Sequence, residues 1–419
     1  MNSLDLFGIL IVLAALFAFI NHRYIKLPAA IGIMLLSLVT SIVLLLLGLA
    51  VPVIGEAARG FVTSIDFDQT LMEGMLSFLL FAGALHVNLD DLKEQWKLVL
   101  ALATVGVVLS AFLIGFLAFG TSEVFGFTLP FIWCLAFGAL IAPTDPVAVL
   151  GVLKSVGAPK SLETKITGES LFNDGVGVVV FLAIVATMTT MADAAGGSAD
   201  VDLLGILKLF IYEAGGGILL GLAGGFAVYK LLASINSFQV EVLLTIALVA
   251  GASRFAHALH ISGPLAMVVA GLLLGNYGRS FAMDEETRDH LDKFWHLIDE
   301  ALNAVLFLLI GLELFVIQLE PKVLLFGAVM IPLSLLVRFI AVAGPVTILK
   351  RFRTFSPGVI KILTWGGLRG GISIALALSL PPGPERDILL TATYVIVIFS
   401  VAVQGTTLKG LIRRHLPER

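Results

Sequence analysis

Charged residues and cysteine are scarce in this sequence. Charged side chains make up 13% of its 419 residues, about half the share found in soluble domains, so the chain cannot fold as one soluble core. The single cysteine, Cys134, lies in an apolar run and cannot form an internal disulfide. The sequence also lacks Cys/His clusters with metal-ligand spacing and nucleophile–base pairs. We therefore expect no enzyme activity, no cofactor and no nucleic-acid partner.

Apolar residues, by contrast, dominate the chain. They make up 58% of it, with a mean hydropathy of +1.04, and they fall in runs of about 17–25 residues, the length that spans a bilayer as a helix. This pattern predicts an all-α polytopic membrane protein. The start of the chain lacks the basic residues of a cleaved signal peptide, so we interpret the first run as a retained helix. Thirteen runs are predicted to be helices: 4–20, 27–50, 70–88, 97–119, 128–152, 166–191, 203–232, 239–258, 262–276, 295–317, 323–349, 358–380 and 388–410.

Lysine and arginine are distributed unevenly between the predicted loops. If the N-terminus lies outside, most of the 26 basic residues fall in inside loops and in the C-terminal tail, as the positive-inside rule requires. The basic pair Arg413–Arg414 is interpreted as an anchor at the lipid of the inner leaflet. We therefore predict an external N-terminus and a cytoplasmic C-terminus in a cell (inner) membrane.

The sixth run opens with an unusual polar motif, Gly168-Glu169-Ser170-Leu171-Phe172-Asn173-Asp174-Gly175. Carboxylates inside a bilayer are costly and mark ion pathways. We predict that Asp174 binds a cation and a proton in turn, because a poorly solvated carboxyl group favours its protonated form and lets the proton compete with the cation. Asn173 adds polarity without a second titratable charge, and its amide could orient neighbours or bridge the fifth and sixth runs. The alternative is that Asp174 caps a helix or forms a salt bridge between helices.

Two other runs contain helix-breaking sequence. In the fifth run, Ala142-Pro143-Thr144-Asp145-Pro146 holds Thr144 and Asp145 between two prolines, each of which removes a helix hydrogen bond. The helix should unwind there and free carbonyls and half-helix ends as cation ligands; a proline kink for packing is the alternative. In the twelfth run, Gly366-Gly367-Leu368-Arg369-Gly370-Gly371 weakens the helix around Arg369. The two runs are seven apart and therefore cross the membrane in opposite directions, as an inverted-repeat transporter requires.

Glu169 is expected to pair with an arginine. Arg338, deep in the eleventh run, is the first candidate and Arg369 is the second, although Arg369 could instead neutralise the carbonyl ends of the broken twelfth run. Two weaker candidates are Glu73 for an ion-path role and Asn303 as a cross-link between helices.

These motifs, together with Phe294-Trp295 and Ile310-Gly311-Leu312-Glu313, resemble the NhaP-type sodium/proton antiporters of cation–proton antiporter family 1 over about residues 5–412. The resemblance implies an NhaA-like antiporter fold with thirteen helices, inverted repeats with two discontinuous crossing helices, and a homodimer. It also implies a dimerisation domain formed by 1–90 and 193–320, and a core ion-transport domain formed by 91–192 and 321–419.

The same resemblance implies the composition of the ion site. Its cation ligands would be Asp174, the Ser170 hydroxyl and the Thr144 backbone carbonyl, with Asp145 nearby. A Glu169–Arg338 bridge, Asn173 and Arg369 would support them. Members of the family with an Asn-Asp pair exchange one cation for one proton, so the resemblance implies electroneutral exchange.

The chain departs from the family pattern late in the third run. Many relatives carry an acid there, whereas the matching stretch, Leu80-Phe81-Ala82-Gly83-Ala84, has none, so water would have to complete the ion shell on that side.

The predicted function is antiport of Na⁺ or Li⁺ against H⁺. A K⁺/H⁺ antiporter and, in a different class, a cation channel are the alternatives, although no repeated pore loop is visible.

Overall fold

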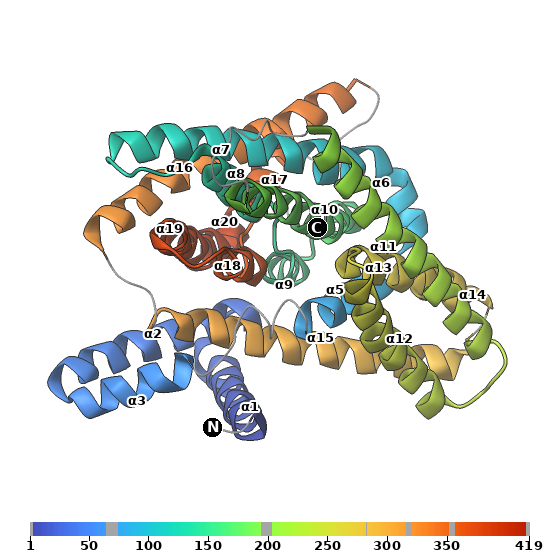
Figure 1. The fold of residues 1–419 in the computed structure, drawn as a ribbon. Helices are drawn as coiled ribbons and strands as arrows, with labels where there is room; N and C mark the ends of the chain where they lie inside the picture. Colours follow the sequence, from blue (N-terminus) through green and yellow to red (C-terminus); the bar gives the residue numbers. More distant parts are fainter. Residues whose placement is uncertain are drawn as a thin grey trace.

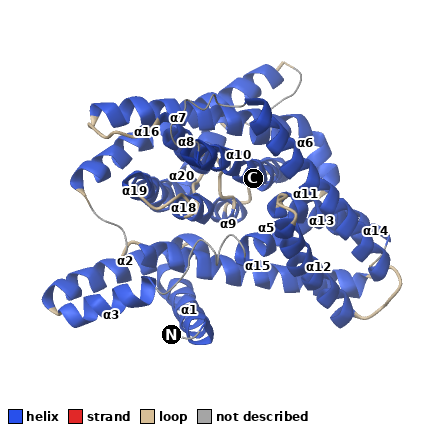
Figure 2. Cartoon of the chain, in the orientation of Figure 1, coloured by secondary structure: helices blue, strands red, loops and turns tan. Residues whose placement is uncertain are grey.

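The computed structural model describes residues 3–63, 74–193, 203–281, 283–315, 320–351 and 357–415. Within these ranges all regular structure is helical, and none of them contains a strand (Figure 2). The predicted all-α fold is confirmed. Glu73 lies outside the described residues.

The N-terminal helices lie against a long central helix, α15 (Glu285–Glu313). Both α1 (Ser3–Ile20) and α2 (Ala29–Ala50) contact α15, and α2 lies beside it in the lower part of Figure 1. Another helix, α3 (Pro52–Thr63), lies between the second and third predicted runs and packs against α2. It is not among the thirteen predicted runs because it is too short and too polar to be identified as a membrane span, although Pro52 is well suited to the first position of a helix.

Four helices complete this side of the molecule: α5 (Leu76–Leu85), α11 (Leu203–Leu232), α12 (Phe238–Ala258) and α13 (Gly263–Leu273). The helix α13 packs against the other three, and both α5 and α12 also contact α15. Aromatic contacts hold α5 to α15, with the rings of Phe81 and Trp295 4.7 Å apart. The cavity described below lies along this α5–α15 pair.

The remaining helices come from two distant parts of the chain and pack together in the upper part of Figure 1. From the middle of the chain, α7 packs against α16, and α8 against α18 and α19 from the C-terminal part. Besides the two broken helices, this group contains α6 (Leu89–Ala101), α7 (Val107–Val124), α10 (Lys160–Asp193), α16 (Pro321–Leu349), α19 (Pro384–Phe399) and α20 (Thr406–His415). Between these helices lie four short π-helical segments, η1 (Asn21–Ile25), η3 (Leu102–Gly106), η4 (Leu274–Gly278) and η5 (Ser400–Gly405). The three-residue helix α14 (Arg279–Phe281) follows η4.

Two helices of this group are interrupted, at the positions that the sequence predicted. The fifth run forms α8 (Phe131–Ile141) and α9 (Val147–Ser155), with Pro143 to Pro146 in the break. The twelfth run forms α17 (Val359–Trp365) and α18 (Gly371–Leu378), with the glycine cluster in the break. The two breaks touch, because the N–H of Asp145 donates to the carbonyl of Leu368 at 2.8 Å.

Length and composition mark many of these helices as membrane-spanning. Among the described residues, nine helices are long and apolar enough to cross a membrane, and the shorter apolar helices include Leu76–Leu85 and Phe131–Ile141. Each of the thirteen predicted runs overlaps a helix or a broken pair, although thirteen membrane crossings remain a prediction.

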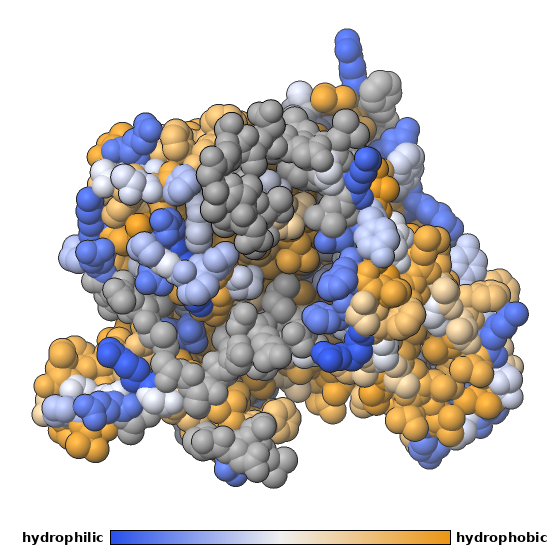
Figure 3. All heavy atoms as spheres, in the orientation of Figure 1, coloured by the Kyte–Doolittle hydropathy of each residue, from blue (hydrophilic) through white to orange (hydrophobic). Residues whose placement is uncertain are grey.

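Large apolar side chains such as Val12 and Leu219 are exposed, and apolar residues cover broad areas of the outer surface (Figure 3). This is the surface of a multi-pass membrane protein, with lipid rather than water around it.

Candidate ion-binding site

The polar motif of the sixth run lies on α10, buried at the centre of the molecule. Glu169, Ser170, Asn173 and Asp174 are each at most 5% exposed. Glu169 and Asn173 are one turn apart, as are Ser170 and Asp174, so the four side chains occupy two adjacent rows of one helix. Buried polar groups are usually hydrogen-bonded or paired, so the partners of each of the four indicate its role.

The amide of Asn173 holds the break between α8 and α9. Its Nδ2 donates to Oγ1 of Thr144 at 2.8 Å, and its Oδ1 accepts from the N–H of Thr144 at 3.3 Å. The Thr144 hydroxyl also lies 3.2 Å from the hydroxyl of Ser170. The side chain of Asn173 thus satisfies backbone and side-chain groups that the broken helix leaves without partners. The predicted bridge between the fifth and sixth runs is present.

Asp145 lies where the first residues of two half-helices converge. Its Oδ1 accepts from the N–H of Val147 at 2.8 Å, at the start of α9. Its carboxylate also lies against Gly370, where a Cβ would overlap with it, next to the start of α18. A negative charge is favourable at both positions because helix N-termini carry a partial positive charge. Position 370 therefore requires glycine, because the Asp145 carboxylate lies too close to leave room for a side chain. Asp145 in turn helps to fix the point at which the two broken helices cross.

Two buried arginines lie at the opposite ends of these broken helices. Arg369 donates through Nη1 to the carbonyls of Ala142, at 2.6 Å, and Pro143, at 2.7 Å, just beyond the last residue of α8. Arg338 donates through Nη2 to the carbonyl of Leu363, in the last turn of α17, at 3.2 Å. Each guanidinium thus meets the negative end of a half-helix.

The pairing of Glu169, which the residues alone left open, is with Arg338. Nη1 of Arg338 donates to the Glu169 carboxylate, and the two side chains are only 8% and 2% exposed. The alternative role given to Arg369, neutralising the carbonyl ends of the twelfth run, was wrong: Arg369 binds carbonyls of the fifth run instead. The contact joins two helices that are far apart in the sequence, so the position of Arg369 along its own helix could not reveal it.

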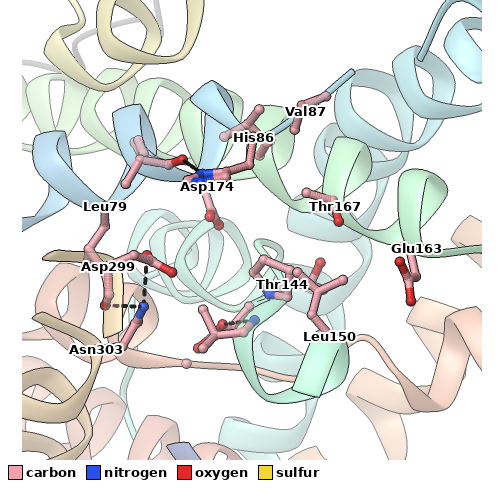
Figure 4. Close-up of a pocket in the computed structure, with 18 of the residues that line it drawn as sticks. Leu79, His86, Val87, Thr144, Leu150, Glu163, Thr167, Asp174, Asp299 and Asn303 are labelled. Atoms are coloured by element: carbon pink, nitrogen blue, oxygen red, sulfur yellow. Dashed lines mark hydrogen bonds between the residues drawn. The ribbon is translucent and has the colours of Figure 1, made fainter. Parts of the chain in front are cut away.

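A cavity of about 490 Å³ reaches this region from one face of the molecule. Asp174, Thr144 and Asp145 line it, and the close-up shows Asp174 and Thr144 among its walls (Figure 4). Within the described part of the chain, no side chain donates a hydrogen bond to the Asp174 carboxylate. Ser170, Asn173, Glu169 and both arginines are not among the described lining residues. Among the described lining residues, Asp174 is therefore the one polar side chain that the motif contributes, beside the apolar Leu171.

Among the acids that line this cavity, the sequence analysis missed Asp91, Glu163 and, on α15, Asp299. Asp299 lines the cavity together with Asn303 (Figure 4). Nδ2 of Asn303 donates to Oδ1 of Asp299 at 3.0 Å and to its main-chain oxygen at 2.9 Å. The predicted role of Asn303 as a cross-link between helices was therefore wrong, because its partner lies one turn earlier on the same helix. An acid four residues before an asparagine within an apolar run was the signal that could have identified Asp299.

Comparison with known proteins gives a consistent result. A family model described as "Sodium/hydrogen exchanger, transmembrane" matches residues 10–414. The Na(+)/H(+) antiporter NhaP of Pseudomonas aeruginosa is 48% identical over 422 residues, which covers 98% of this chain and 96% of that protein. The Na(+)/H(+) antiporter NhaH of Halobacillus dabanensis is 36% identical over 399 residues, covering 94% and 93%.

A solved structure shares the fold. The structure of the sodium proton antiporter MjNhaP1 from Methanocaldococcus jannaschii at pH 8 superimposes with a TM-score of 0.73. The match covers 100% of both chains at 22% sequence identity. The overall helical fold of this chain is thus shared with that antiporter structure.

Proposed function

The chain belongs to the sodium/hydrogen exchanger family, and from that premise we propose that Asp174 is the group at which Na⁺ and H⁺ compete as the protein exchanges one for the other across a membrane. The protein is a transporter and not an enzyme, and the transported ions are its substrates.

One observation carries the assignment to Asp174. Its carboxylate lines the cavity, and no described side chain donates a hydrogen bond to it. The neighbouring polar groups are engaged: Glu169 with Arg338, Asn173 with Thr144, and Arg369 with two carbonyls. A buried carboxylate without a partner is costly in its ionised form unless a cation binds to it. Asp174 therefore suits alternate loading with a proton or with Na⁺, but not with both.

Oxygen atoms around Asp174 would complete the coordination of Na⁺. Thr144 lines the same cavity, and Ser170 contacts Thr144 from one turn before Asp174 on α10. We assign the Ser170 hydroxyl and the Thr144 backbone carbonyl as further ligands, because hard cations favour oxygen ligands. Asp145 lies nearby and adds negative potential. Asn173 positions Thr144, while Arg369 and the Glu169–Arg338 pair hold the half-helices around the site.

The charge state of these residues supports electroneutral exchange. Asn173 is neutral and uses both ends of its amide on Thr144. Glu169 is compensated by Arg338 within the protein. This leaves Asp174 as the group that binds Na⁺ and H⁺ in turn, so each turnover exchanges one Na⁺ for one H⁺.

The position of the cavity suggests how access alternates. Its walls come from α5 and α15 on one side and from α9, α10 and α18 on the other. We propose that 91–192 and 321–419 form a core domain that shifts against a dimerisation domain formed by 1–90 and 193–320. Such a shift would close this cavity and open another on the opposite face. The exposed apolar helices would then serve lipid contact and a homodimer, in an inner membrane with the N-terminus outside.

The central test is removal of the Asp174 charge. Asp174→Asn should reduce Na⁺-driven H⁺ exchange in proteoliposomes to background at every Na⁺ concentration, because an amide cannot bind the transported proton. Asp387→Asn, which removes an exposed acid from the first turn of α19, should exchange like the unmodified protein. Thermal unfolding of both variants verifies that they fold. Exchange by folded Asp174→Asn at more than background would remove Asp174 from this role.

A further inference from the structure

The helix α15 presents a row of side chains to the same cavity as Asp174. His296, Asp299, Asn303 and Leu306 all line it. Their spacings of three, four and three residues place them on one face of the helix. The row therefore forms a continuous strip along one wall of the cavity.

The strip leads from the mouth of the cavity to the broken helices. The side chain of His296 is 55% exposed, whereas Asn303 is 6% and Leu306 is 4% exposed. At the buried end, Leu306 lies against Gly371, the first residue of α18. Asp299 precedes Leu306 by seven residues, which is about 10 Å along a helix. A cation from the mouth would therefore pass Asp299 before it reaches the crossing of the broken helices.

The local chemistry of Asp299 suits a cation. Asn303 holds it through Nδ2, which donates to Oδ1 and to the main-chain oxygen of Asp299. Because the nitrogen of this amide makes both contacts, the carbonyl oxygen of Asn303 is available as an acceptor beside the carboxylate. A carboxylate and an amide oxygen one turn apart are suitable ligands for a hard monovalent cation.

The described ion pairs around the mouth of the cavity do not include Asp299. Lys160 lies 3.9 Å from Asp91, and Arg279 is paired with Asp292. No described lysine or arginine lies within 4.0 Å of Asp299. The facing wall on α5 contributes Ala82 and Gly83, which have no polar side chain. Asp299 therefore supplies negative charge on the α15 wall, in addition to Asp145 and Asp174 elsewhere in the cavity.

We infer that Asp299 and Asn303 form a second cation position, which holds Na⁺ on its way between the mouth and Asp174. This inference rests on the proposed role of Asp174 as the exchange site. A negatively charged group within a low-dielectric cleft raises the local concentration of cations and speeds their binding. Asp299 lowers the Na⁺ concentration that half-saturates transport, whereas Asp174 performs the exchange.

Transport kinetics of the full chain in proteoliposomes test the inference. Asp299→Asn should raise the half-saturating Na⁺ concentration about tenfold and leave the maximal rate within about twofold of the original, since Asp174 is intact. Asp299→Ser is measured in parallel, so that the result does not depend on the folding of one variant. Asp299→Glu should restore most of the apparent affinity. The matched control is Glu300→Gln, which removes an acid of the same helix that is 68% exposed and is not among the described lining residues.

Cation binding can also be measured without transport. In the Asp174→Asn background, NaCl should still raise the unfolding temperature relative to choline chloride at equal ionic strength, because the Asp299 position remains. The double variant Asp174→Asn/Asp299→Asn should lose this response, and Asp174→Asn/Glu300→Gln should keep it.

Two sets of outcomes separate the inference from the proposed function. If folded Asp299 variants keep the original half-saturating Na⁺ concentration, or lose only maximal rate, the second position is refuted while Asp174 is unaffected. Equal NaCl responses in both double variants would refute it as well. If Asp174→Asn transports normally, the proposed exchange site itself fails.

Discussion

At the scale of single residues, the Glu169–Arg338 pair is the clearest case of polar groups with a structural role. Both side chains are buried, and Arg338 also binds the carbonyl of Leu363. Removing one partner of a buried ion pair leaves an uncompensated charge, at a cost of about 3–5 kcal/mol. We therefore predict that Glu169→Ala lowers the free energy of unfolding by this amount and changes the half-saturating Na⁺ concentration little. Thermal unfolding in detergent and transport kinetics measure the two quantities.

The double variant Glu169→Ala/Arg338→Met is the control for this prediction. It removes both charges, so it should recover part of the stability that Glu169→Ala loses. A Glu169→Ala protein that unfolds at the original temperature would contradict the structural role. An unchanged stability with a large loss of Na⁺ affinity would instead place Glu169 in the ion site.

At the scale of helices, the crossing depends on how closely the two breaks approach each other. A Cβ at Gly370 would overlap with the Asp145 carboxylate, which also accepts a hydrogen bond from the N–H of Val147, the first residue of α9. Gly370→Ala should therefore displace Asp145 and the break beside Asp174. Because a displacement of about 1 Å at a reacting centre can cost a hundredfold in rate, we predict a loss of exchange of about ten- to a hundredfold, measured in proteoliposomes.

Gly344→Ala is the matched control for Gly370→Ala. Gly344 lies within α16, and a Cβ there would meet nothing within 4 Å. Alanine is favoured over glycine in a helix by about 1 kcal/mol, so this variant should exchange normally and unfold at the same or a higher temperature. Similar activity in both variants would show that the close approach at Gly370 is dispensable.

The helix breaks could be predicted from the sequence because their causes are local. Pro143 and Pro146 each remove a helix hydrogen bond, and the glycine cluster near Arg369 weakens the helix through the conformational freedom of glycine. The buried position of Asp174 followed from its apolar surroundings. These features need no knowledge of which helices are neighbours.

Other features of the site could not be predicted because they depend on the packing of distant helices. Arg369 binds carbonyls of Ala142 and Pro143, more than two hundred residues away in the chain. Asp299 faces the cavity only because α15 has a particular rotation about its axis. A sequence pattern identifies polar residues in an apolar run, but rotation and neighbours decide which of them share a cavity.

At the scale of the whole molecule, the proposed stoichiometry determines how exchange responds to voltage. The buried charges near the site are fixed by contacts within the protein: Glu169 by Arg338, and Arg369 by two carbonyls. If Asp174 moves one Na⁺ out for one H⁺ in, no net charge crosses the membrane in a cycle. The membrane potential then does no work on the cycle, whatever distance the site travels through the bilayer.

We therefore predict that a membrane potential alone drives no exchange. Proteoliposomes with equal pH and equal Na⁺ on both sides should show no net Na⁺ or H⁺ flux when a K⁺ ionophore imposes the potential. A pH gradient should drive Na⁺ flux at the same rate with the potential clamped at zero or left free. Flux driven by the potential would mean that a second charge group moves with Asp174, and Asp145 and Asp299, the other acids that line the cavity near it, would be the residues to substitute next.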